Sequence, residues 1–245
     1  MKIIIFGGNG YVATELIRQS LRSPQVDSLV VLSRSPVAIP EGLDATKMKG
    51  IIVDDYGQYP EGVRREFVGA HAGVWTVGIT PRKAKLYSEE EVRRVCETCP
   101  LAGFQTLAES HVAEKFKFIY MSASHCERDQ TKPPALMFGQ FLLMRGEVEN
   151  KLISLVAKYR DKMQLQIVKP AYIFSANTVT GLVNTAIAKV VRSAFSSWTT
   201  LTIEEAGAAI LSQIFGGLEK ETLDTKDMLR LGQKALNQSD SGAKS

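Results

Sequence analysis

The sequence predicts an α/β protein, built as one doubly wound parallel sheet with helices on both faces and folded as a single domain. Short apolar runs rich in β-branched residues alternate with longer stretches of helical periodicity along the chain. A glycine-rich turn joins the first apolar run to the first helical stretch. The 245 residues are 44% hydrophobic, and no repeat, linker or change in composition divides them.

The expected strands are the short apolar runs. Lys2–Phe6 is apolar without a break after its first residue, which is typical of a strand buried on both faces of a sheet. Further runs of this kind are Leu29–Leu32, Gly50–Val53, Gly73–Val77, Phe116–Met121 and Leu165–Val168. Because helical stretches separate most of these runs, we expect the strands to lie parallel.

The expected helices lie between these strands. Tyr11–Leu21 carries apolar residues at helical spacing and ends before Ser23-Pro24. Ser88 precedes three glutamates, which predicts a capped helix start, and this helix is expected to run towards Cys99-Pro100. Further helical patterns cover Gly62–Val68, Phe138–Lys158, Leu182–Phe195 and Ile203–Phe215.

These patterns predict one domain over residues 1–236. Residues 237–245 are rich in Ser, Gly, Asp and Lys and are expected to form a flexible tail. The helix Phe138–Lys158 carries a stripe of Phe, Leu, Met and Val over residues 138–156. Either a homodimer interface or burial inside one subunit explains that stripe.

Composition and the N-terminal sequence narrow the cellular setting. The net charge is +4, from 30 Lys and Arg against 26 Asp and Glu, without long basic blocks, so nucleic-acid binding is not indicated. No apolar stretch is long enough to span a membrane. Met1–Phe6 resembles the start of a signal peptide, but Gly7–Gly10 interrupts it. Because Cys96, Cys99 and Cys126 are too few for a disulfide framework, a reduced, cytoplasmic protein is expected.

The glycine turn has the form GxxGxxA and predicts a phosphate-binding site. Gly7 allows the sharp turn after the strand, Gly10 lets the backbone approach a pyrophosphate, and Ala13 permits close packing of helix on strand. The amides at Tyr11 and Val12 open the helix, whose positive dipole end faces the anion. A tight turn without a ligand is the alternative. No Gly-Lys-Ser/Thr follows, which excludes a P-loop.

The end of the second strand indicates which dinucleotide would bind. NAD enzymes place an acidic residue there for the ribose hydroxyls, whereas this chain has Ser33-Arg34-Ser35. A guanidinium between hydroxyls suits a 2′-phosphate, so the sequence favours NADP(H). Arg34 as a solvated loop residue is the alternative. Asp54 follows the third strand, where it is placed to meet the adenine amino group or to form a simple turn.

Several motifs fall in an order that resembles a known superfamily. They are Gly7-Gly8-Asn9-Gly10, Leu32-Ser33-Arg34, Val77-Gly78-Ile79-Thr80, Tyr120-Met121-Ser122-Ala123, Arg145-Gly146-Glu147-Val148-Glu149-Asn150 and Val168-Lys169-Pro170-Ala171-Tyr172-Ile173. This order resembles the atypical short-chain dehydrogenase/reductases, in the TIP30-like branch of the NAD(P)-binding, epimerase-like proteins, and extends to about Leu236. More loosely, the chain is similar to fungal tailoring oxidoreductases. The resemblance implies a Rossmann-type fold with Gly78 beside the cofactor and with small C-terminal helices that cover the substrate.

The chain departs from that superfamily at the catalytic pair. The resemblance places Phe141 where the superfamily has its tyrosine acid–base, and Arg145 where it has the lysine that assists the tyrosine. Ser122 matches the superfamily serine. Phe141 cannot transfer a proton, and losing a general acid typically costs ~10²–10⁴ in rate. Arg145 can still hold ribose hydroxyls, although its pKa is too high for proton chemistry near neutral pH.

Two other residues are candidates for the missing acid. His125 follows Ser122 at the carboxyl end of a strand, and Tyr172 follows Lys169-Pro170. A loop histidine on the rim of the pocket and an ordinary loop tyrosine are the alternatives. Cys96-Glu97-Thr98-Cys99 lies near the expected end of a helix, where the dipole raises thiol pKa values, so core cysteines are favoured over a redox pair. No metal site is expected.

The resulting functional hypothesis is an NADP(H)-dependent oxidoreductase that acts on a small organic carbonyl or enone, with Ser122 and Arg145 orienting the substrate and His125 or Tyr172 supplying the acid. Two alternatives follow from Phe141 and Arg145. One is a non-redox isomerase, dehydratase or cyclase that uses the same cleft. The other is a non-catalytic NADP(H) sensor that binds a protein partner.

Overall fold

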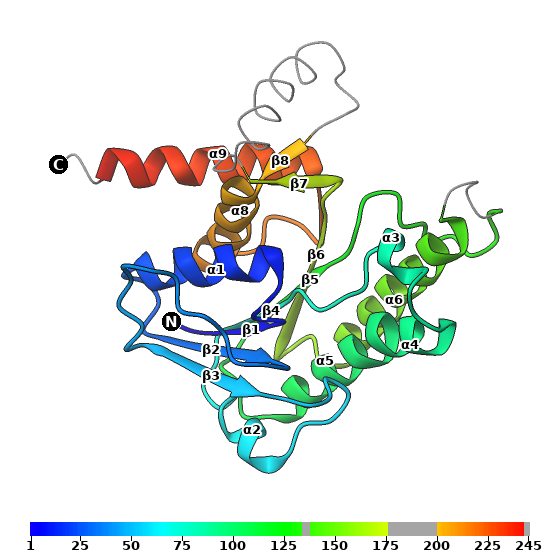
Figure 1. Cartoon of the computed structure of the whole chain (residues 1–245), viewed down its shortest axis with the longest axis horizontal. Helices are drawn as coiled ribbons and strands as arrows, with labels where there is room; N and C mark the ends of the chain where they lie inside the picture. The colour runs from blue at the N-terminus through cyan, green and yellow to red at the C-terminus, as the bar shows by residue number, and fades with distance from the viewer. Residues whose placement is uncertain (134–137, 176–199, 243–245) are drawn as a thin grey trace, which may run out of the picture.

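The computed structural model describes residues 1–133, 138–175 and 200–242, and the side chains to residue 238 (Figure 1). Its centre is a parallel sheet of seven strands in the order β3-β2-β1-β4-β5-β6-β9. The strands are β1 Lys2–Phe6, β2 Ser28–Ser33, β3 Met48–Ile52, β4 Ala72–Trp75, β5 Phe116–Met121, β6 Met163–Lys169 and β9 Thr222–Asp224. This arrangement confirms the predicted doubly wound α/β fold.

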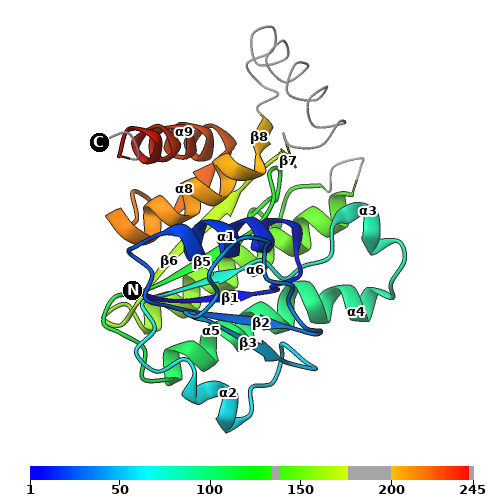
Figure 2. The same cartoon turned by 60° about the vertical axis from the view of Figure 1, so that its left-hand side comes forward.

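Helices cover both faces of the sheet, as Figure 2 shows. On one face lie α1 (Tyr11–Arg22), α8 (Ile203–Gly216) and α9 (Thr225–Gly242), which pack against one another. On the other lie α5 (Cys99–Glu109) and α6 (Gly139–Lys158). The shorter helices are α2 Glu61–Arg65, α3 Pro81–Ala84 and α4 Glu89–Arg93.

The apolar core has two halves, one on each face of the sheet. In β1, Ile3 and Ile5 point into the half formed with α1, α8 and α9, whereas Ile4 and Phe6 point into the half formed with α5 and α6. All four side chains are at most 1% exposed. Burial on both faces explains why the sequence of this strand is apolar without alternation.

The predicted helix that starts at Ser88 does not stop at Cys99-Pro100, as the sequence analysis expects. It passes from α4 through a π-helical turn, Arg94–Thr98, into α5. Proline inside an α-helix lacks an amide proton and clashes with the carbonyl four residues earlier. The wider π turn ends two residues before Pro100, which lies in the first turn of α5 and needs no amide donor there.

Other boundaries differ from the expected ones in smaller ways. β3 begins two residues before Gly50, β4 ends at Trp75 rather than Val77, and α2 ends at Arg65 rather than Val68. α9 runs to Gly242, so residues 237–242, expected to be a flexible tail, are helical. The predicted helix Leu182–Phe195 lies outside the described residues. A second, two-stranded parallel sheet of β7 (Tyr172–Phe174) and β8 (Thr200–Thr202) was not expected.

The apolar stripe of α6 is used inside the subunit. Met144, Val148 and Leu152 are buried in the core half that α6 forms with the sheet and α5. Burial within one subunit therefore explains the stripe, and the structure gives no support to the homodimer alternative. In the described parts of the chain, no helix combines the length and apolar character needed to cross a bilayer.

A reciprocal cap fixes the start of α8. The Thr202 hydroxyl accepts from the Glu205 amide at 3.1 Å, and the Thr202 amide donates to Glu205 Oε2 at 2.8 Å. Replacing Thr202 by alanine is expected to lower the free energy of unfolding by about 1 kcal/mol, because one helix amide loses its acceptor. Urea unfolding measures the change. Ser88→Ala, which removes a cap without the reciprocal bond from the exposed helix α4, should cost less; an equal or larger loss there would contradict this ranking.

Candidate functional site

The glycine turn between β1 and α1 is held by backbone hydrogen bonds that leave little room for side chains. The amides of Gly7 and Gly8 donate to the Leu32 carbonyl at 3.0 and 2.9 Å, and the Gly10 amide donates to the Gly7 carbonyl at 2.7 Å. Gly7 has φ +92°, and a Cβ there would lie 2.9 Å from Thr76 Oγ1. These contacts hold the turn in one shape between β2 and β4.

Gly8 was not identified as a site residue from the sequence, yet it is the most restricted glycine of the turn. A Cβ on Gly8 would lie 2.3 Å from Val31 Cγ1 and 2.8 Å from Val37 Cγ2. The motif GxxGxxA treats this position as variable, and so gives no signal for it. Tight packing of the turn on β2 and the loop after it requires the glycine.

The first turn of α1 presents backbone amides at the end of β1. Gly10 is the N-cap, with extended backbone and no side-chain cap, and the Thr14 amide makes the first helical bond to its carbonyl at 2.9 Å. The amides of Tyr11, Val12 and Ala13 therefore stand outside the helical ladder. Amides at the positive end of a helix dipole favour an anion. The cradle that the glycines leave thus fits a dinucleotide pyrophosphate.

Asn9 connects this turn to the loop that carries Arg34. Asn9 Nδ2 donates to Ser35 Oγ at 2.9 Å and to the Ser35 carbonyl at 3.1 Å. The Ser33 hydroxyl donates to the same carbonyl. These bonds fix the loop after β2 beside the glycine turn and leave the Arg34 side chain exposed. Asn9 is a second residue that the motif treats as variable.

Tyr56 lies beneath the same loop, on the core side. Its hydroxyl donates to the Leu32 carbonyl at 3.0 Å. Burial raises the pKa of Tyr56 to about 12, against an opposing effect of the nearby Arg34 charge. Asp54, at the end of β3, is exposed, whereas its neighbour Asp55 is tied to Arg94 at 2.5 Å.

Gly78 and Arg145, which are far apart in the sequence, meet beyond the ends of β4 and β5. Arg145 reaches from α6, and its Nη2 donates to the Met121 carbonyl at 2.8 Å. Its guanidinium lies over the ring of Tyr120, 5.0 Å from the ring centre. A Cβ on Gly78 would lie 3.7 Å from Arg145 Nη1. The structure therefore brings these two predicted residues into one place.

Ser122 directs its hydroxyl to a buried carboxylate that the sequence analysis did not single out. Ser122 Oγ donates to Glu149 Oε1 at 2.5 Å. Glu149 is 0% exposed and also accepts from Arg128 Nε at 2.7 Å and Lys169 Nζ at 3.0 Å. The sequence did contain a signal for this carboxylate, because Glu149 lies one helical turn after Arg145 and therefore on the same side of α6. The hydroxyl proton of Ser122 is committed to Glu149, so Ser122 faces other groups as an acceptor.

The two candidate acids are both exposed. His125 lies in a turn with left-handed backbone, φ +66°. Tyr172 is 59% exposed on β7, and its ring stacks on Phe174 with centres 6.4 Å apart. Within the described residues, no hydrogen bond, ion pair or ring contact joins either side chain to Ser122 or Arg145. Phe141 packs against the apolar core half on the α6 side.

Comparison with known sequences gives one weak relative. No protein-family profile matches the chain. Leucinostatins biosynthesis cluster protein T of Purpureocillium lilacinum is 29% identical over 123 residues, which are 50% of this chain and 43% of that protein. The match thus spans less than half of the relative's length.

Comparison with solved structures gives the fold. Uronate dehydrogenase from Agrobacterium tumefaciens has a TM-score of 0.62 at 14% identity, over 91% of this chain and 76% of that chain. Vestitone reductase from alfalfa has a TM-score of 0.63 at 10% identity, and the match covers 91% of this chain and 76% of that chain. UDP-glucose 4-epimerase from Thermotoga maritima has a TM-score of 0.64 at 12% identity, and the match covers 96% of this chain and 82% of that chain. The chain shares the fold of these enzymes. The narrower resemblance to the TIP30-like branch stays a prediction.

The three cysteines are free and buried in this fold. Cys96 Sγ accepts from the Ile79 amide at 3.3 Å, which ties the π-helical turn to the loop after β4. Burial raises the pKa of the Cys99 thiol to about 11, which makes it a poor nucleophile. Across residues 1–133, 138–175 and 200–242, no group of His, Cys, Asp and Glu has the arrangement of a metal site.

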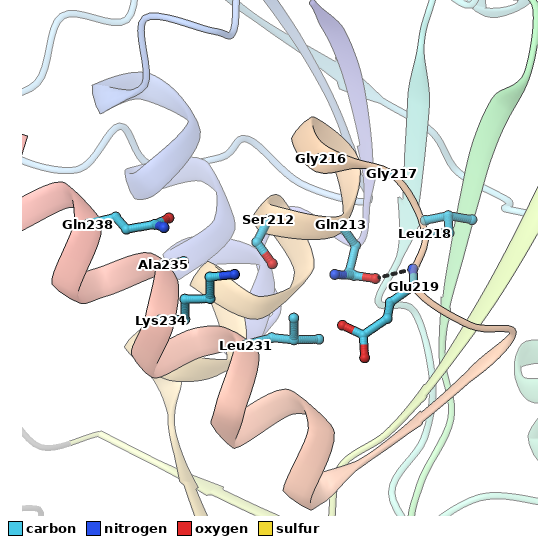
Figure 3. Close-up of a pocket in the computed structure, with 10 residues that line it drawn as sticks. All are labelled: Ser212, Gln213, Gly216, Gly217, Leu218, Glu219, Leu231, Lys234, Ala235 and Gln238. Carbon is cyan, nitrogen blue, oxygen red and sulfur yellow. Dashed lines mark hydrogen bonds between the residues drawn. The ribbon is translucent and has the colours of Figure 1, made fainter.

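A hollow of about 450 Å³ lies between α8 and α9 (Figure 3). Gln213 lines it, and its Oε1 accepts from the Glu219 amide at 2.8 Å and from Gln166 Nε2 at 3.0 Å. The hollow adjoins the C-terminal end of α8, which leads to the start of β9. Ligands of open α/β sheets bind at the carboxyl ends of the strands, so this hollow is separate from the predicted cofactor site.

Proposed function

We propose that the chain is an NADP(H)-dependent oxidoreductase of the atypical short-chain dehydrogenase/reductase type, acting on a small organic carbonyl or enone in secondary metabolism. The single observation that carries this proposal is the glycine cradle, with its three amides ahead of the first bond of α1. Uronate dehydrogenase, which shares the fold, has been solved with NAD as a variant. A bound nicotinamide dinucleotide supplies hydride-transfer chemistry.

The loop after β2 supports the choice of NADP(H). Asn9 and Ser33 hold this loop beside the cradle, so Arg34 is presented by a preformed backbone. No acidic side chain stands in Ser33-Arg34-Ser35 to repel a phosphate. Asp54 is assigned to the adenine side of the same site, at the end of β3. An exposed guanidinium on a loop with such a fixed backbone suits a 2′-phosphate.

At the other end of the site, this chain's residues bind and orient. Gly78 places no side chain against the Nη1 edge of Arg145, and Arg145 is assigned to donate from this edge to oxygen atoms of the nicotinamide ribose or of the substrate. Ser122, whose hydroxyl donates a hydrogen bond to Glu149, accepts a hydrogen bond from a substrate hydroxyl. Tyr172 or His125 serves as proton donor from the exposed side. Phe141 moves no proton.

One observation favours a second candidate function. Phe141 packs into the core half beside α6, in place of a hydroxyl directed at a substrate. An apolar ring in that place suits a cleft used for isomerisation, dehydration or cyclisation. The relative from a biosynthesis cluster is compatible with either chemistry. Oxidation of NADPH in the presence of quinones, enones or aldehydes distinguishes the oxidoreductase from this alternative.

The cofactor assignment predicts a preference that depends on Arg34. We expect NADPH to bind at least ~10-fold more tightly than NADH, because charge-assisted hydrogen bonds to the 2′-phosphate contribute ~1.5–3 kcal/mol. Arg34→Ala should remove this preference and leave NADH binding unchanged. Isothermal titration calorimetry measures both affinities. Arg65→Ala, which removes an exposed arginine from α2, is the control and should change neither. Equal affinities in the wild-type protein would refute the assignment.

A further inference from the structure

The Arg145 guanidinium is buried without a negative partner. Its residue is 5% exposed, and its contacts are the Met121 carbonyl and the face of Tyr120, with the Cys96 thiol beside it. No carboxylate of the described residues forms an ion pair with it. The buried carboxylate one turn further along α6, Glu149, is already paired with Arg128 and Lys169. Burying a charge without a counter-charge is costly, so this arrangement favours a ligand that brings one.

An exposed glycine lies beside one edge of this guanidinium. Gly78 is exposed and has no side chain, and a Cβ there would come no closer than 3.7 Å to Arg145 Nη1. The loop around Gly78 is fixed, because Trp75 Nε1 donates to the Val77 carbonyl at 3.0 Å and the Ile79 amide to Cys96 Sγ at 3.3 Å. Nη1 of the buried guanidinium therefore lies next to an exposed position without a side chain, at the carboxyl edge of the sheet.

The segment that follows this loop adds positive charge. Arg82, Lys83 and Lys85 are exposed on and just after α3, and no acidic residue occurs between Gly78 and Ser88. Lys85 Nζ lies 5.7 Å from the ring centre of Phe138, so this basic segment reaches the start of α6, the helix that carries Arg145. The buried cation and the exposed ones together attract an anion to this edge.

We propose that the substrate carries a carboxylate, and that this carboxylate pairs with Arg145. The proposal rests on the proposed function, because it assigns the substrate class of the same site. Ribose hydroxyls accept hydrogen bonds but leave the positive charge uncompensated, whereas a planar carboxylate matches the fork of N–H groups and neutralises it. The substrate would then be an organic acid that also contains the carbonyl or enone group.

The first test compares carboxylates with neutral molecules of the same shape. Acetate and benzoate are titrated into the full chain by calorimetry, beside acetamide and benzamide, with and without NADPH. We expect at least one acid to bind ~10-fold more tightly than its amide, and Arg145→Gln to remove the difference. Arg93→Gln, at an exposed arginine of α4, should preserve it. Equal binding of acids and amides, or tighter binding of inorganic phosphate than of either acid, would overturn the proposal.

The second test uses stability and does not require a ligand. Because its charge lacks a partner, replacing Arg145 by methionine should leave the Tm of the unliganded protein unchanged or raise it. A fall in Tm larger than that of Arg93→Met would show that the protein already compensates this charge. NADPH affinity is measured on the same samples. If acids bind through Arg145 but NADPH does not bind, only the proposed NADP(H)-dependent function is refuted. If NADPH binds but acids are not preferred over amides, only the proposal of a substrate carboxylate is refuted.

Discussion

Replacing Glu149 by alanine is expected to lower the free energy of unfolding by about 3–5 kcal/mol, because it leaves two cations without their shared partner. Glu149 is fully buried and holds Ser122, Arg128 and Lys169 together. Without it, Lys169 loses its carboxylate partner, and Arg128 keeps Glu221, at 3.0 Å. Urea-induced unfolding measures the loss, and Glu149→Gln, which keeps the size and part of the hydrogen bonding, should lie between wild type and alanine.

The matched control for Glu149 lies on the same helix. Glu147 is half-exposed and pairs with Lys151 at 2.8 Å, so its replacement by alanine should cost less than about 1 kcal/mol. If Glu149→Ala were as mild as Glu147→Ala, the buried network would contribute nothing to stability. Its place under Ser122 would then need another explanation.

Gly10→Asp is expected to weaken NADPH binding by ~100-fold or more while the protein stays folded. A carboxylate at this position would stand where the pyrophosphate is proposed to bind, and opposed like charges cost several kcal/mol. Aspartate is also a favourable N-cap, so the helix itself should not suffer. The Cβ would lie 3.0 Å from the Gly7 carbonyl oxygen, so the backbone of the turn must shift by a few tenths of an ångström to accept it. Calorimetry gives the affinity, and circular dichroism checks the fold.

Gly62→Asp serves as the control for this substitution. It places the same carboxylate in the first turn of α2, where no atom outside the local backbone lies within 4 Å of the new Cβ. NADPH affinity should be unchanged in that variant. Unchanged affinity in folded Gly10→Asp as well would remove the glycine turn from the cofactor site.

The parts of the fold that the sequence predicts best are those governed by local patterns. β1 and the start of α1 match to the residue, since an unbroken apolar run, a glycine turn and helical spacing follow one another. The passage of the helix across Pro100 was missed, because the π turn before it has no pattern of its own. β9 was missed because Thr222–Asp224 is a short edge strand whose pairing with β6 depends on distant residues.

The residues of the candidate site also fall into those that a local pattern predicts and those that depend on tertiary packing. Gly7, Gly10 and Ala13 follow from the turn itself, because one short segment contains both the strand end and the helix start. That Arg145 lies against Gly78, or that Ser122 bonds to Glu149, depends on how α6 packs against the ends of β4 and β5. Residue order cannot specify such contacts without the tertiary structure. The steric need for Gly8 likewise appears only when Val31 and Val37 are in place.

The core half shared by α1, α8 and α9 has a consequence for synthesis of the protein. α1 leaves the ribosome well before α8, which packs against it, and before α9, which packs against α8. Until residues 203–242 have been synthesised, Leu16 and Ile17 can pack only against the strands that have already formed, and not against α8. The nascent chain therefore exposes apolar surface on this face until α8 has been synthesised, and chaperones that bind apolar segments can act on it during that interval.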